Sequence, residues 1–164
     1  MLSIFQAETP EHIALAQELM TEYAQALEFN LCFQNFEKEM AELPGKYAPP
    51  AGRLFLAFWE GQPAGVIALR PMEDIAKCEM KRLYVRPAFR GHAIGRLLAE
   101  KAIAAARENG YTHMCLDTIQ GKMDRAIRMY RELGFQETSA YYHNPMERVL
   151  YMELPLHTLV QNRQ

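Results

Sequence analysis

Apolar and polar positions follow two different periods along the first third of the chain. Residues 2–7 alternate as in a short strand, and apolar residues then recur at helical spacing from about 10 to 29. Thr9 and Pro10 favour a helix start, because a hydroxyl can accept first-turn amides and proline needs no donor there. A second helical piece is predicted over 35–43, ending at the Pro-Gly pair that follows.

The middle of the chain has the alternation of a sheet. Residues 54–59 and 64–69 read as two strands on either side of a Glu-Gly-Gln-Pro turn, which predicts a hairpin. Residues 77–85 form the next predicted strand. The sheet is therefore expected to begin antiparallel.

Helical and strand periods alternate in the second half. A helix is predicted from Ile94 to the Asn-Gly pair at 109–110, followed by a strand over 114–118. A strand, a helix and a further strand in this order predict a right-handed parallel crossover. A helix over 121–133 and a final strand pair, 135–137 with 148–154, complete the chain. We expect one α/β domain over residues 1–164, with a mixed sheet of about seven strands and about four helices.

Composition and charge exclude several classes of function. The chain has 164 residues, of which 49% are hydrophobic and 23% charged, which is a globular balance. A net charge of -2 without a Lys/Arg run argues against nucleic-acid binding. No apolar run approaches a membrane span and the start lacks signal-peptide features, so a cytoplasmic location is predicted. Cys32, Cys78 and Cys115 have no metal-ligand spacing, so we expect reduced thiols and no metal.

The segment 83–95 carries the clearest candidate chemistry. A strand ends at Val85 and leads into the small-residue turn Arg90-Gly91-His92-Ala93-Ile94-Gly95, which opens a helix. Backbone N–H groups in such a turn can converge on an anion, and the helix dipole favours negative charge there. Arg90 adds a formal positive charge. The P-loop and Gly-x-Gly-x-x-Gly patterns are absent from this sequence, so a different phosphate site is indicated.

From Cys78 to Phe135 the chain resembles the GNAT superfamily of N-acetyltransferases. The matching residues are Arg90, Ala93 and Gly95 of an Arg-x-x-Gly-x-Gly/Ala motif, then Tyr130, Ala126 and Gly134-Phe135. Ala93 replaces the first glycine of that motif, and Met123 replaces an asparagine found in many members. The segments 44–50, 141–145 and 151–154 further resemble a bacterial branch of the superfamily with Tyr-Tyr-x-Asn-Pro and Tyr-Met-Glu-Leu motifs.

The resemblance implies acetyl-CoA as co-substrate and a parallel central strand pair that splays apart. The pyrophosphate of acetyl-CoA would bind to the backbone amides of the turn. Backbone groups of residues 83–85 would pair with the pantetheine arm and polarise the thioester carbonyl. His92 could touch phosphate or face solvent, and Arg96 could reach the same anion or cover helix surface. The expected cofactor-binding residues are Leu83, Tyr84, Val85, Arg90, Gly91, His92, Ala93, Ile94, Gly95 and Arg96.

Two side chains are candidates for proton transfer. An alkyl ammonium has a pKa of about 10.4, so it must lose a proton before it can attack a thioester. Glu79 is the candidate base, because period two would put it on one strand face with Lys81, Leu83 and Val85; the alternative is a surface salt bridge. Tyr130 is the candidate acid for the CoA thiolate; the alternative is a core tyrosine.

The predicted function is acetyl transfer to a primary amine of an unidentified small molecule or peptide, by direct attack in a ternary complex. The apolar segment 29–36 either belongs to the core or borders a partly hydrophobic acceptor pocket, which the 141–143 loop could also border. Asp117 and Thr118 could contact the acceptor or cap a helix. A non-catalytic acyl-CoA-binding sensor or interaction module, and transfer to oxygen or of a longer acyl group, remain open alternatives. The apolar C-terminal strand could support a homodimer.

Overall fold

The computed structural model describes residues 1–27 and 35–156, and its strands form one mixed sheet. Within these ranges the sheet has seven strands in the order β1-β2-β3-β4-β5-β7-β6. Only the β4–β5 pairing is parallel among these strands. The mixed sheet with a parallel central pair is thus confirmed. The strands are β1 (Leu2–Gln6), β2 (Arg53–Trp59), β3 (Gln62–Pro71), β4 (Lys77–Val85), β5 (His113–Ile119), β6 (Gln136–Thr138) and β7 (Val149–Pro155).

Four α-helices lie in the described ranges, as the apolar periodicity predicts. They are α1 (Pro10–Ala26), α2 (Phe36–Glu42), α3 (Ile94–Glu108) and α4 (Asp124–Glu132). The Thr9 hydroxyl accepts a hydrogen bond from the His12 amide at 3.1 Å, which confirms the expected start of α1. None of these helices has the length and apolarity needed to cross a membrane.

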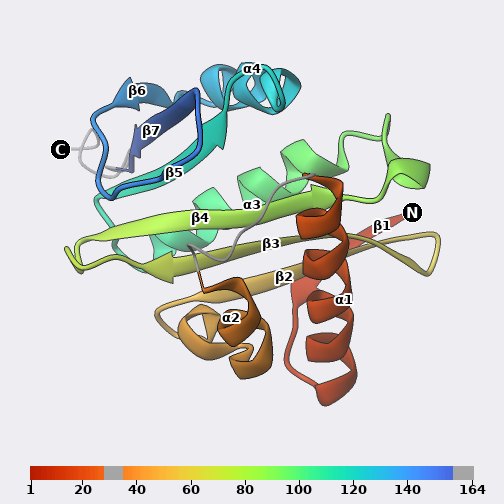
Figure 1. Cartoon of the computed structure of the whole chain (residues 1–164). Helices are drawn as coiled ribbons and strands as arrows, with labels where there is room; N and C mark the ends of the chain where they lie inside the picture. Colours follow the sequence, from red (N-terminus) through yellow and green to blue (C-terminus); the bar gives the residue numbers. More distant parts are fainter. Residues whose placement is uncertain (28–34, 157–164) are drawn as a thin grey trace, which may run out of the picture.

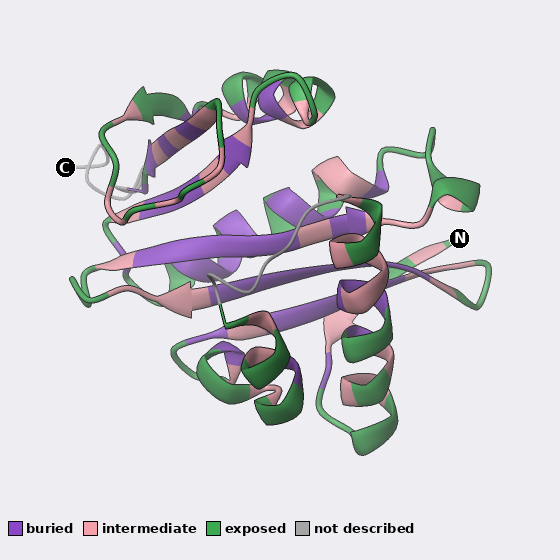
Figure 2. Cartoon of the chain, in the orientation of Figure 1, coloured by how far each residue is buried: buried purple, intermediate pink, exposed green. Residues whose placement is uncertain are grey.

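The helices cover the sheet on both faces (Figure 1). On one face, here called the α3 face, α3 and α4 pack against residues such as Ile67, Met80 and Leu116. On the other, the α1/α2 face, α1 and α2 pack against residues such as Leu56 and Tyr84. The central strands β3 and β4 are therefore buried from both sides (Figure 2).

The parallel strands β4 and β5 stay together for a short distance. Residues 77–79 pair with residues 113–115, and beyond them the strands diverge (Figure 1). Past Glu79, the edge of β4 that faces β5 has no partner among the described strands. The sheet therefore opens where the candidate chemistry begins.

A β-bulge in β4 changes which side chains share a face. Val66 pairs with Tyr84 but Ala68 pairs with Lys81, so Arg82 and Leu83 together oppose one residue of β3. Arg82 has φ = +63°, a left-handed conformation that costs about 1–2 kcal/mol for a residue with a side chain.

The bulge overturns one sequence-based expectation about β4. Glu79 and Lys81 lie on the α1/α2 face, where they form an ion pair at 3.9 Å. Leu83 and Val85 instead pack against the core of the α3 face. The strict alternation expected over 79–85 was wrong, because the extra residue reverses the facing after Lys81.

Candidate functional site

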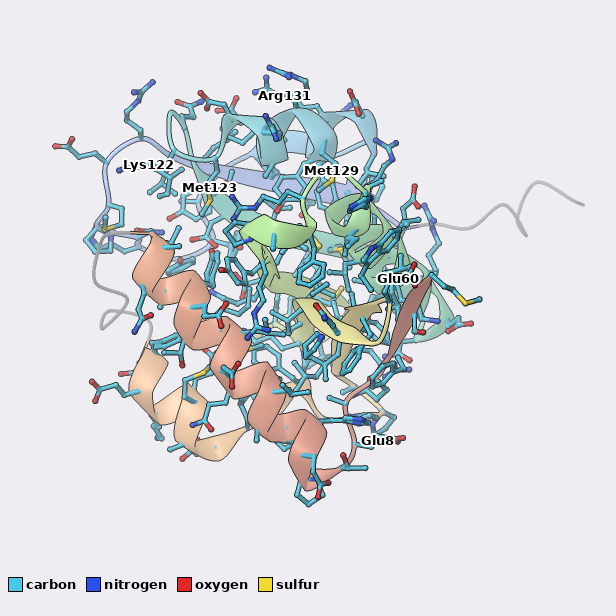
Figure 3. The ribbon with its side chains drawn as sticks, turned by 90° about the vertical axis from the view of Figure 1, so that its right-hand side faces the viewer. Glu8, Glu60, Lys122, Met123, Met129 and Arg131 are labelled. Carbon is cyan, nitrogen blue, oxygen red and sulfur yellow. The ribbon has the colours of Figure 1, made fainter. Side chains whose placement is uncertain are left out.

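A cavity of about 730 Å³ occupies the opening between β4 and β5. This volume is within the range of small-molecule and cofactor sites. Its lining residues come from both faces of the sheet, so the opening connects the α3 face with the α1/α2 face. The lining consists of residues 80–85 of β4, residues 116–119 of β5, Arg90, Gly91, residues 93–96, Tyr23, Ala26, Leu27, Lys122, Met123, Arg125, Ala126, Met129, Tyr130, Asn144 and Met146. Figure 3 labels Lys122, Met123 and Met129 of this wall.

The turn before α3 presents unbonded backbone amides to this cavity. Gly91 has φ = +94° and Ala93 has φ = +61°, so the chain bends sharply just before the helix. The helix start has no side-chain cap, and none of the N–H groups of residues 91–96 donates a hydrogen bond to a described residue. A helix N-terminus in this state attracts anions.

Arg90 and Arg96 make the same end of the cavity cationic. The Arg90 Nε donates to the Val85 carbonyl at 3.1 Å, which fixes its guanidinium beside the end of β4. Arg96 is paired with Glu132 at 2.9 Å and with Glu100 at 3.4 Å. These exposed pairs contribute little stability, so an anionic ligand can compete for the guanidinium.

Gly95 leaves room on the cavity side of the helix start. A Cβ at this position would meet Val85 Cγ2 at 3.7 Å, which is an ordinary contact. Packing within the protein therefore does not require glycine here. The missing side chain, the unbonded amides and the two arginines together fit a pyrophosphate group.

Tyr130 projects from α4 into the cavity wall. Its side chain is 7% exposed and its ring contacts Phe135 edge-on, with centroids 5.7 Å apart. Its phenol makes no hydrogen bond to any residue in 1–27 or 35–156. Burial, aided by nearby Tyr23 and Asp117, raises the pKa of Tyr130, so the phenol stays protonated and able to donate at neutral pH.

The α1/α2 side of the cavity carries charged groups that contact the loop between β6 and β7, which contains Tyr142 and Asn144. Asp117 of β5 accepts hydrogen bonds from the Tyr142 hydroxyl and, at 2.8 Å, from Asn144 Nδ2. Lys81 lies across from it on β4, with its ammonium 6.0 Å from the centre of the Tyr142 ring. Tyr151 of β7 donates to the Tyr142 carbonyl at 2.6 Å and so fixes the loop to the sheet.

Comparison with known proteins agrees with this geometry. A family model described as the acetyltransferase (GNAT) family matches residues 13–135. An uncharacterized N-acetyltransferase of Schizosaccharomyces pombe is 39% identical over 156 residues, covering 94% of this chain and 95% of that protein. The chain belongs to the GNAT acetyltransferase family.

This GNAT acetyltransferase is also similar to further relatives and to solved structures. N-acetylaspartate synthetase of Danio rerio is 33% identical over 122 residues, covering 69% of this chain and 43% of that protein. A GNAT acetyltransferase of Staphylococcus aureus has a TM-score of 0.77 at 18% identity, covering 96% of this chain and 100% of that chain. A putative acetyltransferase of Salmonella typhimurium, solved with its cofactor acetyl-CoA, has a TM-score of 0.71 at 19% identity, covering 95% and 94% of the two chains. These structures share the fold.

Most of the expected cofactor-binding residues of this GNAT acetyltransferase line one cavity. Among them His92 does not line it. Its imidazole stacks on Trp59 of β2, with ring centroids 4.3 Å apart and an interplanar angle of 20°. His92 therefore supports the turn from outside the cavity.

Glu79 lies behind the cavity wall and does not line it. It is 3% exposed and sits among three donors, all on the α1/α2 side. Arg70 Nη2 approaches one carboxylate oxygen at 3.0 Å, while the Tyr141 hydroxyl donates to the other at 2.7 Å and the Lys81 ammonium lies 3.9 Å away. The surface salt bridge considered from the sequence is in fact a buried network.

Asp117 and Thr118 do not cap α4. The amide of Gly121 instead donates to Asp124 at 2.7 Å, and Met123 occupies the N-cap position without a capping side chain. Thr118 donates to Met123 Sδ at 3.3 Å. Asp117 instead lines the cavity wall.

Sequence reasoning missed Tyr23, Lys81 and Arg82 as cavity residues. Tyr23 reaches the cavity because α1 is fixed to the end of β4 by Arg86, which binds Glu22 at 2.7 Å. The bulge that turns both Lys81 and Arg82 to one face has no glycine or proline to reveal it. Residues 29–34 of the apolar segment expected to border the acceptor lie outside the described residues. Within the described ranges no three His, Cys, Asp or Glu side chains gather as a metal site.

Proposed function

We propose that this acetyltransferase moves the acetyl group of acetyl-CoA to a primary amine by direct attack in a ternary complex. The observation that carries the proposal is the opening between β4 and β5, with unbonded amides at one end and the Tyr130 phenol in its wall. Acetyl-CoA supplies an activated thioester. The amides of 91–96 with Arg90 and Arg96 would hold its pyrophosphate, while Ile94 packs beneath the turn.

The free edge of β4 would bind the pantetheine arm and the thioester carbonyl. Backbone groups of residues 83–85 on this edge lack a partner strand, and an amide-containing arm can pair with them as a further strand would. An N–H group near Leu83, Tyr84 or Val85 would then polarise the carbonyl. This arrangement requires no side chain from these residues, which remain in the core.

The transfer conserves protons and bonds as follows. The ammonium of the acceptor loses a proton, its nitrogen bonds to the acetyl carbon, and the carbon–sulfur bond breaks. The departing thiolate takes a proton from Tyr130, and the second proton lost by the nitrogen returns to the Tyr130 phenolate, so that one proton is released in total. We retain Glu79 as the proposed base; since it does not line the cavity, a water molecule must carry the proton to it.

The Tyr130→Phe variant tests the acid role. We expect acetyl-CoA affinity within about twofold of the wild type, and kcat lower by about a hundredfold or more, since general acids contribute that much. CoA release with a panel of amines, read by a thiol reagent, measures kcat, and calorimetry measures binding. Tyr111→Phe is the matched control, because Tyr111 is buried outside the cavity, where its hydroxyl donates to the Ala51 carbonyl. Unchanged turnover in Tyr130→Phe would exclude this acid.

A second candidate function is an acyl-CoA-binding module without turnover. It is favoured by the position of Glu79 behind the cavity wall and by Met123 in place of the asparagine of many members. Saturable acetyl-CoA binding without CoA release for any amine would support this alternative. The absence of acetyl-CoA binding at millimolar concentration would contradict both functions.

Three finer expectations stay predictions. They are membership of the bacterial branch with the C-terminal tyrosine motifs, a cytoplasmic location, and homodimer formation. The relative named N-acetylaspartate synthetase has an acetylated amino acid in its name, which supports a small amine as acceptor here.

A further inference from the structure

The bulge in β4 places two consecutive cationic side chains on the same side of the sheet. In a regular strand Lys81 and Arg82 would point to opposite faces. Here Lys81 pairs with Glu79 and Arg82 with Glu39, both on the α1/α2 face, and both residues are among those that line the cavity. The left-handed backbone of Arg82 is strained, and such strain is commonly kept where a site needs it.

Both cations are held in fixed positions from behind. Arg82 binds Glu39 of α2 through Nε at 3.0 Å and Nη2 at 2.8 Å, and its guanidinium lies over the Phe36 ring at 5.2 Å. The side chains of Lys81 and Arg82 are 4% and 3% exposed, and Lys81 is approached by Glu79, which Arg70 also binds. Two immobilised cations on one wall are suited to an anionic group of a ligand.

The opposite wall presents a carboxylate. Asp117 belongs to β5, which has already diverged from β4, so the cavity separates it from Lys81. The Tyr142 and Asn144 hydrogen bonds both reach its Oδ2, whereas no hydrogen bond from a described residue reaches Oδ1. Asp117 can therefore accept a hydrogen bond from an ammonium group in the cavity without losing its support.

We propose that the acceptor is a small zwitterionic amine, in the simplest case a free α-amino acid, whose carboxylate is bound by Lys81 with Arg82 and whose ammonium is bound by Asp117. This inference rests on the proposed acetyl transfer and names its substrate class. The acceptor enters from the α1/α2 face, while the phosphate-binding turn and Tyr130 lie on the α3 face. Transfer forms the carbon–nitrogen bond, breaks the carbon–sulfur bond, and leaves an N-acetyl amino acid, CoA and one proton.

Other acceptor classes fit this wall less well. A polyamine would bring further positive charge beside Lys81 and Arg82. An amine without a carboxylate would give these two side chains no anionic group to bind. The apolar cavity residues Leu27, Met123 and Met146 give space for the remainder of an amino acid side chain.

Paired substrates test the proposal on the wild-type chain. L-amino acids are compared with their carboxamides and with their decarboxylated amines, using acetyl-CoA and thiol detection of CoA release. For at least one amino acid, kcat/KM should exceed that of both partners by about tenfold or more, the equivalent of one charge-assisted hydrogen bond. Equal or faster turnover of the carboxamides or decarboxylated amines throughout the panel would overturn the proposal.

Variants of Lys81 and Asp117 test the roles assigned to these two residues. Lys81→Met and Asp117→Asn should each raise KM for the preferred amino acid by about tenfold or more, and leave KM for acetyl-CoA unchanged. Lys81→Arg should restore most of the amino acid KM, since it keeps the charge. Lys101→Met on the exposed side of α3 is the matched control and should change neither constant. If Lys81→Met fails to fold, the isosteric Asp117→Asn still decides, and an unchanged KM there would contradict the assignment.

Calorimetry separates failure of this inference from failure of the proposed function. One outcome is that the protein binds acetyl-CoA but neither acetylates any amino acid nor binds one in the presence of CoA. This outcome would overturn the acceptor assignment and leave the proposed acetyl-CoA site intact. Absence of acetyl-CoA binding would remove both. Acetylation of carboxamides alone would retain the acetyltransferase and exclude the zwitterionic acceptor.

Discussion

Ala93 shows how a single residue shapes the turn that we propose as the pyrophosphate site. It occupies the N-cap of α3 with φ = +61°, where the family motif has glycine. A side chain in this left-handed region costs about 1–2 kcal/mol. Glycine would remove this cost, but it would also raise the conformational entropy of the unfolded chain, which offsets part of the gain. The turn keeps its shape despite this cost, because α3 packs firmly against β3 and β4.

We therefore expect Ala93→Gly to raise the free energy of unfolding by about 1 kcal/mol. Acetyl-CoA binding should be equal or tighter, since no side chain is added near the amides. Thermal and denaturant unfolding measure the first effect and calorimetry the second. Ala104→Gly on the exposed side of the same helix is the control and should lower stability by about 1 kcal/mol. A lower unfolding free energy in Ala93→Gly would contradict the strain argument.

At the scale of elements, α2 is attached to the bulge of β4 by one carboxylate. Glu39 accepts two hydrogen bonds from Arg82 and one from the Tyr47 hydroxyl, at 2.8 Å. Burial alone would raise the pKa of Glu39, but its hydrogen bonds and charge interaction with Arg82 lower it below its ordinary value of 4.5. The pair should therefore stabilise the fold at neutral pH and lose this effect in acid.

The Glu39→Gln variant should lose about 3 kcal/mol of unfolding free energy at pH 7, because Arg82 remains buried beside a neutral partner. The difference from wild type should be full above pH 4.5 and should shrink as pH falls through the lowered pKa of Glu39. Denaturant unfolding across pH measures this. Glu42→Gln, exposed on the same helix, should match the wild type. A difference that grows in acid would contradict the assigned direction.

The elements themselves were predictable because their signals are local. The strand over 77–85 agrees with the structure to the residue, and the helix expected after the glycine-rich turn begins at Ile94. The bulge at Arg82 was not predictable, because it arises from pairing with β3 rather than from any local residue preference. For the same reason the sequence did not show that Lys81 and Arg82 both line the cavity, whereas Asp117, considered as an acceptor contact, does line it.

At the scale of the whole molecule, the opening of the sheet joins two compartments. The α3 face carries the proposed pyrophosphate site and the α1/α2 face carries Lys81, Arg82 and Asp117, with the β4–β5 cavity between them. Two ligands can therefore enter from opposite faces and meet at the centre. A covalent acyl-enzyme is unnecessary in this arrangement.

Initial rates should therefore give intersecting lines in double-reciprocal plots when acetyl-CoA and amine concentrations are both varied. Direct attack requires both ligands to be bound at once, whereas an acyl-enzyme route gives parallel lines. Mass spectrometry of the protein incubated with acetyl-CoA alone is the control and should give the unmodified mass. Parallel lines together with a stoichiometric acetyl adduct would contradict the ternary complex.

The stacking of Trp59 on His92 gives the turn an optical reporter. Trp59 is the single tryptophan of the chain, and its partner lies among the amides expected to grip the diphosphate. A ligand that settles on those amides alters the imidazole beside the indole, and with it the intrinsic fluorescence of the whole protein. The affinity for acetyl-CoA can then be measured by following Trp59 fluorescence during a titration, without a dye, a coupling enzyme or any knowledge of the amine.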